Sequence, residues 1–290
     1  IYNAGGGLST AFSRSSPIVL IAGQIPRSTI GKNFGGLHEV NDQKEITNPV
    51  TKWQKLVLRP SEVPENIHEA FRQAMSDRPS PVHFELPPET MVEREEVQLL
   101  EPAQIIRRLP SSSLIEQAAK EIAAARKPVI YAGGGIARSD AETELVAFAE
   151  SARIAVLTSA GGKGTMSEKH PLALGGSLGP SGLLKDYIED ADLIIGIGTR
   201  FSMRNQAGDE ARLVHIDADP EMIGHVHKNT LGLVGDVKET LPLLGAAIQS
   251  AGGGGWNSPV EEVRDIQRKL TVSEDELTHP QEDYIQALQK

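Results

Sequence analysis

Short apolar runs and amphipathic stretches alternate along the N-terminal third of the chain. Residues 17–24 form a continuous apolar run that ends in glycine and glutamine, a pattern typical of a buried parallel strand. Residues 52–58 and 82–87 predict two further strands, and the apolar positions of 64–75 recur at helical spacing between them. We therefore expect a β–α–β arrangement that ends near residue 92.

The same alternation returns at Ser113, which can cap an amphipathic helix, and it continues for most of the remaining chain. Strands that alternate with helices predict a parallel sheet covered on both faces. The predicted fold class is therefore α/β, with two parallel-sheet domains that carry helices on both faces, the second of them Rossmann-like. The expected elements after the first helix are helices over 140–152, 182–190 and 237–249 and strands over 129–132, 154–158, 193–198, 213–217 and 233–234.

Two stretches of the chain have the composition of connections. The first is rich in mixed charge, proline and serine, and the second contains four consecutive glycines. The chain also opens without methionine in a loop-like glycine-rich stretch and closes inside a predicted helix, so we expect an internal piece of a longer polypeptide. The predicted organisation is a first domain over 1–92, a linker over 93–112, a second domain over 113–250, a linker over 251–280 and the start of a third domain over 281–290.

Charge and composition narrow the classes of partner. The chain has 29 basic and 39 acidic residues, a net charge of −10, which would repel a phosphate backbone and makes nucleic acid an unexpected partner. No apolar run has the length of a membrane span, so we expect no membrane partner and a cytoplasmic location. Because the chain has no cysteine, disulfides and thiolate chemistry are excluded within it.

Three glycines, Gly133, Gly134 and Gly135, follow the first predicted strand of the second domain. A backbone without Cβ atoms can approach a phosphate or a ribose closely. A purely structural turn is the alternative, because the dinucleotide-binding fingerprint requires glycine at position 138, where the chain has Arg138.

Polar residues also follow two later strands of this domain. Thr199 and Arg200 offer a hydroxyl and a guanidinium that could hold an anionic nucleotide, and a tight turn with a surface arginine is the alternative. His215 and Asp217 lie on one face of the next strand, where an acid can accept hydrogen bonds from ribose hydroxyls. Ordinary helix capping is the alternative for Asp219, and the acid spacing does not match a calcium loop.

The loop after the first strand contains the pair His38 and Glu39. A histidine beside a carboxylate is a common proton-handling pair, and a solvent-exposed pair without a role is the alternative.

An ordered series of short motifs runs through nearly the whole chain. In the first domain these are Gly-Gln-Ile-Pro-Arg-Ser at 23–28, Glu39, Pro-Val-Thr-Lys at 49–52, Arg-Pro-Ser-Pro-Val at 78–82 and Leu-Pro at 86–87. In the second they are Tyr-Ala-Gly-Gly-Gly at 131–135, His-Pro-Leu-Ala-Leu-Gly at 170–175, Gly-Thr-Arg-Phe at 198–201, His-Ile-Asp at 215–217 and Gly-Asp at 235–236. In this order they resemble the acetolactate synthases, a family of thiamine-diphosphate-dependent enzymes.

The resemblance implies that the first domain is the back half of a pyrimidine-binding domain and that the second is the central domain of the family. It implies thiamine diphosphate and Mg²⁺ as cofactors and a 2-keto acid as substrate, in a carboligase or decarboxylase reaction whose carbanion chemistry belongs to the cofactor. In the family, the activating glutamate precedes these segments and the Mg²⁺ motif follows them. We therefore expect no catalytic residue in this chain and no activity from the chain alone.

The resemblance also assigns site residues. Those on the thiamine diphosphate side are Gln24 and Pro26, and His38 and Glu39 lie on the substrate side. The central domain of the family holds FAD, ADP or no nucleotide. The positions implied for that nucleotide are Arg78, Gly133, Gly134, Gly179, Gly182, Thr199, Arg200, Asp217 and Asp236.

The chain departs from the family pattern beside the expected substrate. His38 stands where the family usually has glutamine, and Pro88 stands where it often has lysine. Two acids that usually follow Phe201 are also missing, so the sequence decides neither which keto acid is the substrate nor whether a flavin is bound.

The resemblance further implies a homodimer or homotetramer, with a regulatory subunit as a partner. The alternative function is a non-catalytic, flavoprotein-type nucleotide-binding module, and a structural dimerisation piece is a third hypothesis.

Overall fold

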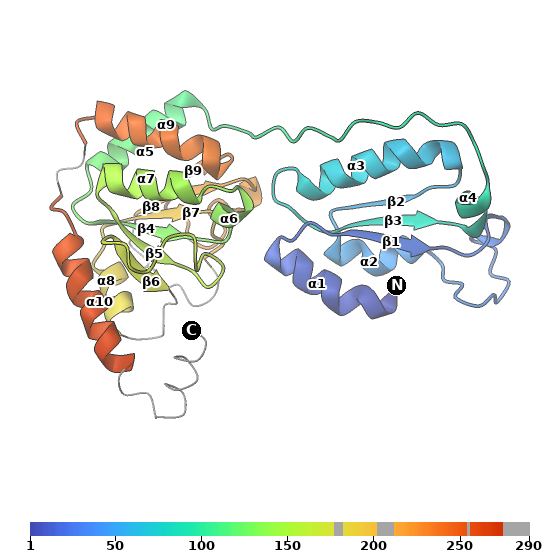
Figure 1. The fold of residues 1–290 in the computed structure, drawn as a ribbon, viewed down its shortest axis with the longest axis horizontal. Coiled ribbons are helices and arrows are strands. Elements are labelled where there is room, and N and C mark those ends of the chain that lie inside the picture. The colour runs from blue at the N-terminus through green and yellow to red at the C-terminus, as the bar shows by residue number, and fades with distance from the viewer. Residues whose placement is uncertain (177–181, 202–211, 254–255, 275–290) are drawn as a thin grey trace. The chain divides into compact units, whose positions relative to one another are not determined.

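The computed structural model describes residues 1–176, 182–201, 212–253 and 256–274. The chain divides into two compact units, Ile1–Arg107 and Arg108–Lys290, called here the N-terminal and C-terminal units (Figure 1). Each unit contains a parallel β-sheet with helices on both faces, so the predicted fold class is confirmed. Among the described residues, no helix combines the length and the apolar character needed to cross a bilayer.

The N-terminal unit has a three-stranded parallel sheet in the order β1-β3-β2. Ala70 and Ala74 of the amphipathic helix α3 pack with Val82 of the central strand, as the helical spacing predicts. The strand expected to be buried, β1, is an edge strand of this sheet, and its Ile21 is 58% exposed. The elements are α1 (Gly5–Arg14), β1 (Val19–Gly23), α2 (Gln43–Thr47), β2 (Trp53–Leu56), α3 (Val63–Met75), β3 (Val82–Leu86) and α4 (Pro88–Val92), with 3-10 helices at Tyr2–Ala4, Arg27–Thr29, Asn48–Val50 and Pro60–Glu62.

The loop-like character expected at the start of the chain is wrong. Three glycines open helix α1, where their low helix propensity has least effect because the first turn lacks intrahelical partners for its N–H groups. Leu8 and Ala11 then lie three residues apart on one face and are buried, which fixes the helix against its own unit.

The C-terminal unit has a six-stranded parallel sheet in the order β6-β5-β4-β7-β8-β9. If these strands are renumbered from one, the order is 3-2-1-4-5-6, the Rossmann arrangement, in which the strand order reverses between β4 and β7: successive strands are added on one side of β4 and then on the other. Ligands of such sheets bind beyond the carboxyl ends of the strands at this point. The strands are β4 (Pro128–Ala132), β5 (Ala155–Thr158), β6 (Ala173–Gly176), β7 (Leu193–Ile197), β8 (Arg212–Asp217) and β9 (Thr230–Val234).

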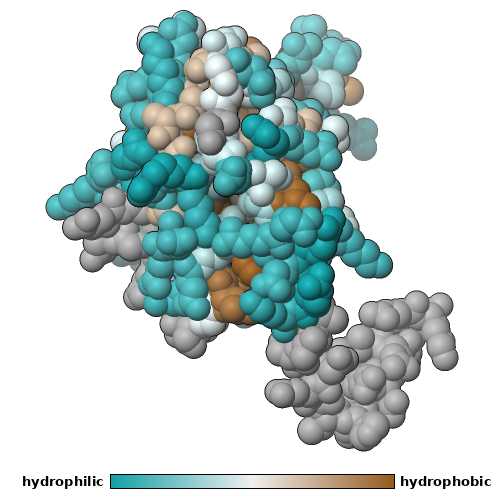
Figure 2. Space-filling model, turned by 90° about the vertical axis from the view of Figure 1, so that its left-hand side faces the viewer, coloured by the Kyte–Doolittle hydropathy of each residue, from teal (hydrophilic) through white to brown (hydrophobic). Residues whose placement is uncertain are grey.

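Helices cover both faces of this sheet because its central strands are apolar on both sides (Figure 1). Side chains of α5, α7 and α9 build the core on one face, and α8 and α10 build a second core on the other. Figure 2 shows that the outside of the molecule is largely hydrophilic on the face in view, with hydrophobic residues in small separate patches. The helices are α5 (Ser112–Ala123), α6 (Gly135–Arg138), α7 (Glu142–Ala152), α8 (Leu183–Glu189), α9 (Val237–Ser250) and α10 (Val260–Glu274), with a 3-10 helix at Pro220–Met222.

Three details of this unit differ from expectation. The stretch expected to be a linker over 251–280 contains α10, whose Val263 and Ile266 are buried in the second core. The cap of α5 is Ser111 rather than Ser113, with its hydroxyl accepting from Leu114 N. Strand β6 was not predicted, because its four residues, Ala-Leu-Gly-Gly, contain no apolar run long enough to indicate a strand. The third domain expected over 281–290 lies outside the described residues.

Candidate functional site

The glycine turn after β4 packs against the turn after β7, at the point where the strand order reverses. Gly133 N donates to Ile197 O at 2.8 Å, and Gly135 N donates to Gly198 O at 2.9 Å. A Cβ atom on Gly133 would lie 2.1 Å from Gly198 O, and one on Gly135 would lie 2.6 Å from Gly198 Cα. Both glycines are therefore required by contacts between two backbones.

This packing gives the glycine motif a structural cause. The volume that a side chain would need at Gly133 and Gly135 is filled by protein, and the same holds for Gly162, whose Cβ would lie 2.3 Å from Ala132 O. At Gly134 the contacts are looser, with the nearest atom at 3.0 Å. The structural alternative therefore accounts for the glycines, whereas their assignment to a nucleotide stays a prediction.

The turn after β7 is held by a histidine of the neighbouring strand. His215, fully buried on β8, donates from Nε2 to Thr199 O at 2.8 Å, and Thr199 Oγ1 accepts from Phe201 N at 3.3 Å. The Phe201 ring stacks on Tyr131 and meets His215 edge to face. A Cβ on Gly196 would lie 2.4 Å from the Phe201 ring, so this glycine makes room for the aromatic side chain.

Burial keeps His215 neutral. Desolvation lowers the pKa of His215 to about 4, against a smaller opposing effect of the hydrogen bond to Thr199 O. Its Nε2 lies 3.9 Å from Asp217 Oδ2, so the two side chains share a face as predicted from their spacing. His215 is therefore a neutral donor that fixes the turn.

The remaining nucleotide candidates differ in their surroundings. Asp217 is buried and accepts from Asp219 N, while Asp236 caps α9 by accepting from Glu239 N. Arg200 is exposed at the end of β7. Gly182 precedes α8 with a positive φ of 110°, and a Cβ atom there would have no neighbour within 4 Å. Gly179 lies outside the described residues. Asp219 caps the 3-10 helix that follows it, as its alternative predicts.

The turn after β1 contains the two residues predicted on the thiamine side. Gln24 Oε1 accepts from Ile25 N at 2.7 Å, and Gln24 Nε2 donates to Glu85 Oε2 at 3.2 Å. Exposed Pro26 follows, and Arg27 N donates to both carboxylate oxygens of Glu89. The turn is thus held from two sides by carboxyl groups of β3 and α4.

The pair His38 and Glu39 does not form a proton-handling contact among the described hydrogen bonds. Glu39 accepts from Phe34 N and Gly36 N and so closes its own loop, and the Gly36 hydrogen bond lowers the pKa of this carboxyl. His38 is exposed and has a positive φ of 66°. His38 is thus exposed, whereas Glu39 is half-buried in the contacts of its own loop, and a proton-handling role for the two stays a prediction.

Arg78 belongs to the N-terminal unit and anchors α1. Its Nε donates to Ser15 Oγ at 2.8 Å, and its guanidinium lies 5.9 Å from the centroid of the Phe12 ring. A nucleotide role for Arg78 stays a prediction.

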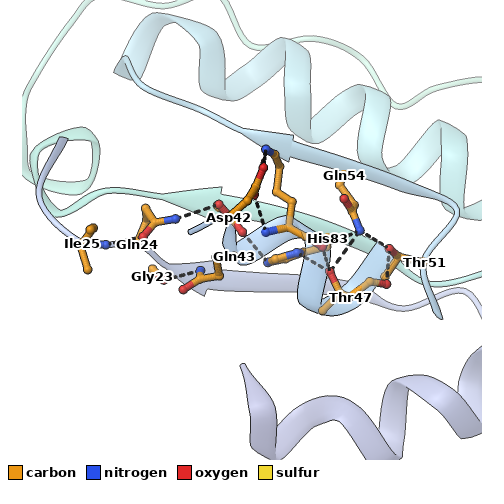
Figure 3. A network of polar contacts seen from close by, with 11 residues as sticks. Gly23, Gln24, Ile25, Asp42, Gln43, Thr47, Thr51, Gln54 and His83 are labelled. Atoms are coloured by element: carbon orange, nitrogen blue, oxygen red, sulfur yellow. Dashed lines mark hydrogen bonds and ion pairs between the residues drawn. The ribbon is translucent and has the colours of Figure 1, made fainter. Parts of the chain in front are cut away.

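A buried polar network in the N-terminal unit was missed by the sequence analysis (Figure 3). His83 and Glu85 lie on one face of β3 and are 0% and 1% exposed. Thr47 Oγ1 of α2 lies 2.8 Å from His83 Nδ1, and Gln54 Nε2 of β2 donates to Thr51 Oγ1 at 2.8 Å. The sequence signal was present, since β3 alternates polar and apolar residues although helices cover both its faces.

Burial shifts the ionisation of both groups toward their neutral forms. Desolvation lowers the pKa of His83 to about 4 and raises the pKa of Glu85. Gln43 Nε2, from the same helix as Thr47, donates to Gly23 O at 2.9 Å and so ties the network to the end of β1. The network therefore connects α2 and β3 to the turn that contains Gln24.

Comparison with known proteins identifies the family. Residues 115–244 match the family model described as "Thiamine pyrophosphate enzyme, central domain". Over 257 residues the chain is 37% identical to the probable acetolactate synthase large subunit of Methanocaldococcus jannaschii, which covers 83% of this chain. The chain belongs to the thiamine pyrophosphate enzymes. The resemblance to acetolactate synthases that the motifs indicate is thereby confirmed.

Other thiamine pyrophosphate enzymes match over the same span. The chain is 31% identical over 255 residues to the probable 2-ketoarginine decarboxylase of Pseudomonas aeruginosa, covering 84% of this chain and 44% of that protein. The crystal structure of benzoylformate decarboxylase from Polynucleobacter necessarius superposes with a TM-score of 0.73 at 27% identity, over 85% of this chain and 47% of that one. The chain spans 43% of the length of the Methanocaldococcus relative, less than half of it.

Proposed function

We propose that this chain is part of a thiamine-pyrophosphate-dependent carboligase or decarboxylase that acts on 2-keto acids. The observation that carries the proposal is the match to acetolactate synthase and 2-ketoarginine decarboxylase relatives over more than four fifths of the chain. One name contains a 2-keto acid, 2-ketoarginine, and the other contains acetolactate, the product of a ligation of 2-keto acids. The two names therefore indicate the same class of substrate but different keto acids. The class of reaction is therefore better supported than the identity of the keto acid.

The turn after β1 fits a polar organic coenzyme. After its bonds to Ile25 N and Glu85 Oε2, the Gln24 amide keeps one N–H and one oxygen lone pair for a further partner. Thiamine pyrophosphate, when bound, supplies the carbanion chemistry of the reaction. The role proposed for Gln24 and Pro26 is to bind and orient this coenzyme, with His38 and Glu39 toward the substrate. Mg²⁺ is proposed as the partner of the diphosphate.

The test uses the complete natural protein with thiamine pyrophosphate, Mg²⁺ and a panel of 2-keto acids. The expected result is release of carbon dioxide together with an aldehyde or a 2-hydroxy ketone product. Gln24→Leu should weaken coenzyme binding about tenfold, the loss of one polar contact, while Gln117→Leu on the exposed face of α5 should not change it. If no keto acid in the panel is consumed while the coenzyme binds, the proposed reaction is wrong.

The strand order of the C-terminal unit favours a second candidate, a nucleotide site for FAD or ADP. Nucleotides bind at the reversal point of such sheets, and exposed Arg200 lies at the end of β7 there. The roles proposed for Arg200, Thr199 and Asp217 are contacts to the anionic and ribose parts of the nucleotide.

Titration of the complete protein with FAD and with ADP tests this site. Arg200→Ala should weaken binding about tenfold or more, since a charge-assisted contact is lost, while Arg126→Ala, an exposed arginine elsewhere in the same unit, should not. Binding that is equal in both variants would show that the nucleotide lies elsewhere. Nucleotide binding without turnover of any keto acid would favour the non-catalytic module.

A homodimer or homotetramer with a regulatory subunit is also proposed, since the relative's name contains "large subunit".

A further inference from the structure

The face of β3 that contacts α2 contains two ionisable side chains, His83 and Glu85, that are buried from solvent. His83 Nε2 and Glu85 Oε1 face each other at 3.6 Å, and neither atom has a hydrogen-bond partner. An isolated buried carboxylate costs several kcal/mol of desolvation, so the pair is stable only in a protonation state that satisfies both atoms. The neighbouring hydrogen bonds indicate which state this is.

The neutral form of Glu85 leaves no charge in the interior and suits the polar contacts around it. With the proton on Glu85 Oε1, this O–H faces the lone pair of His83 Nε2 at 3.6 Å, a polar contact longer than a hydrogen bond, and Glu85 Oε2 remains the acceptor for Gln24 Nε2. His83 Nδ1–H then donates to Thr47 Oγ1 at 2.8 Å, and the Thr47 hydroxyl donates to Lys44 O at 3.1 Å. The Glu85 proton then points at an acceptor, and no charge is buried.

The ionised form is poorer on the same accounting. If Glu85 were ionised beside a neutral His83, whose pKa burial lowers to about 4, the imidazole proton would lie on Nε2 and Thr47 would donate to Nδ1. The fully buried carboxylate would then have only uncharged donors, the Gln24 and Gln43 amides and the imidazole. Asp42 and Lys44 of α2 and the amino group of Ile1 are the charged groups that act on the pair, and the first two pair with each other at 2.9 Å. Their mutual pairing leaves little net charge to stabilise an anion.

We propose that Glu85 is a positioning residue that is uncharged in the folded protein and that, with His83, holds Gln24 and the turn after β1 in place. Gln24 is the connecting group, because its oxygen accepts from Ile25 N, the peptide directly before Pro26. The role of this turn toward the coenzyme rests on the proposed function, whereas the protonation state and the positioning do not. The order of action is from Thr47 through His83 and Glu85 to Gln24.

Two replacements of Glu85 separate positioning from simple packing. In Glu85→Gln, the amide can accept from Gln24 and donate to His83 as the neutral acid does, whereas Glu85→Leu keeps the approximate volume and removes both bonds. Amide hydrogen exchange of the peptide segment that contains Ile25 is the readout, in the complete natural protein without coenzyme. We expect about tenfold faster exchange in Glu85→Leu and less than about twofold in Glu85→Gln. Unchanged exchange in Glu85→Leu, or equal exchange in both variants, overturns the positioning role.

Infrared spectroscopy tests the protonation state directly. The difference spectrum of the natural protein minus Glu85→Gln at neutral pH should contain the carbonyl band of a protonated carboxylic acid. The matched control is Glu69→Gln, because Arg72 lowers the pKa of Glu69 to about 2 and its difference spectrum should contain only carboxylate bands. Carboxylate bands from Glu85 overturn the proposal even if Glu85→Leu does not fold. Neither readout involves thiamine pyrophosphate, so failure of this proposal is distinguishable from failure of the proposed function.

Discussion

Each sheet has a turn held rigidly at the carboxyl end of a strand, beyond central strands in the C-terminal unit and beyond the edge strand β1 in the N-terminal unit, and the two are held by different means. In the C-terminal unit the turns after β4 and β7 are fixed by shape, through backbone contacts that leave no room for a Cβ on Gly133 or Gly135. In the N-terminal unit the turn after β1 is fixed by hydrogen bonds that Gln24 and Arg27 of the turn donate to the carboxyl groups of Glu85 and Glu89. A site fixed by shape should be intolerant of one methyl group, and a site fixed by hydrogen bonds should tolerate isosteres that keep the bonds and fail with those that do not.

The chain contains one tryptophan in each unit, which allows the two to be compared in one sample. Trp53 packs beside the α3 contacts of the N-terminal unit. Trp256 is buried in the C-terminal unit, where its Nε1 donates to Ala152 O and Arg153 O. Single-tryptophan variants, Trp53→Phe and Trp256→Phe, therefore report on the unfolding of one unit at a time.

The largest effect is expected from Gly133→Ala. The new Cβ would lie 2.1 Å from Gly198 O, and because both partners are backbone the strand ends must separate. We expect a loss of more than about 4 kcal/mol of unfolding free energy, measured by denaturant titration with Trp256 as the probe. Gly161→Ala is the matched control, since its nearest atoms lie at 3.7 Å, and it should cost less than about 1 kcal/mol. A mild effect of Gly133→Ala would mean that the turns are not held by shape.

Much of this architecture could be predicted from the sequence, because apolar runs such as that of β7 and helical spacing such as that of α3 record local burial. The spacing of His215 and Asp217 also predicted their common face correctly. Contacts between segments distant in the chain could not be predicted. The partner of Gly133 is Gly198, 65 residues later, and no local pattern indicates that the missing side chain makes room for backbone rather than for a ligand.

The buried network was missed for a related reason. Alternation of polar and apolar residues normally indicates a strand with one solvent-exposed face. From the sequence alone, His83 and Glu85 would therefore be assigned to the exposed face, whereas in the structure α2 covers them. That helix has only five residues within a polar loop, too few for a helical period to be recognised. Of the site residues assigned by resemblance, Gln24 thus belongs to the observed network, whereas the residues that position it were not identified.

The second effect is a pH dependence that distinguishes the units. His215 has a pKa of about 4 when folded against an ordinary value of 6.5, so between these values the unfolded state binds more protons and stability rises with pH. The rise in the C-terminal unit should approach about 3 kcal/mol, followed by Trp256, and His215→Gln should remove it. Exposed His225→Gln is the control and should leave the slope unchanged.

In the N-terminal unit the same slope should be smaller. His83 also has a pKa of about 4 when folded, so its contribution to the unfolding free energy rises with pH between about 4 and 6.5. Glu85 contributes in the opposite direction. Because burial raises the pKa of its carboxyl group, the contribution of Glu85 to the unfolding free energy is lost as the pH rises through that folded pKa. Equal slopes for Trp53 and Trp256 would contradict opposing contributions from the pair.

The third effect compares one hydroxyl in each unit. Thr47→Val keeps the side-chain shape but removes the hydroxyl that lies 2.8 Å from His83 Nδ1, so a buried imidazole nitrogen loses its partner. We expect a loss of about 1–3 kcal/mol in the N-terminal unit. Thr240→Val is the matched control, since that buried hydroxyl only donates to Asp236 O, which also accepts from Thr240 N. It should cost less than about 1 kcal/mol, and equal losses would mean that the network adds nothing beyond local hydrogen bonds.

The smallest effect concerns two helix caps, Asp42 of α2 and Ser111 of α5. Each side chain accepts from a backbone N–H of its own helix, so Asp42→Ala and Ser111→Ala should each cost about 1 kcal/mol in their own unit. Their consequences should nevertheless differ. Helix α2 supplies Thr47 to the network, so its fraying should also speed hydrogen exchange at Ile25, whereas loss of the α5 cap should leave Ile25 unchanged. Equal exchange at Ile25 in both variants would separate α2 from the turn and limit the network to β3 and Gln24.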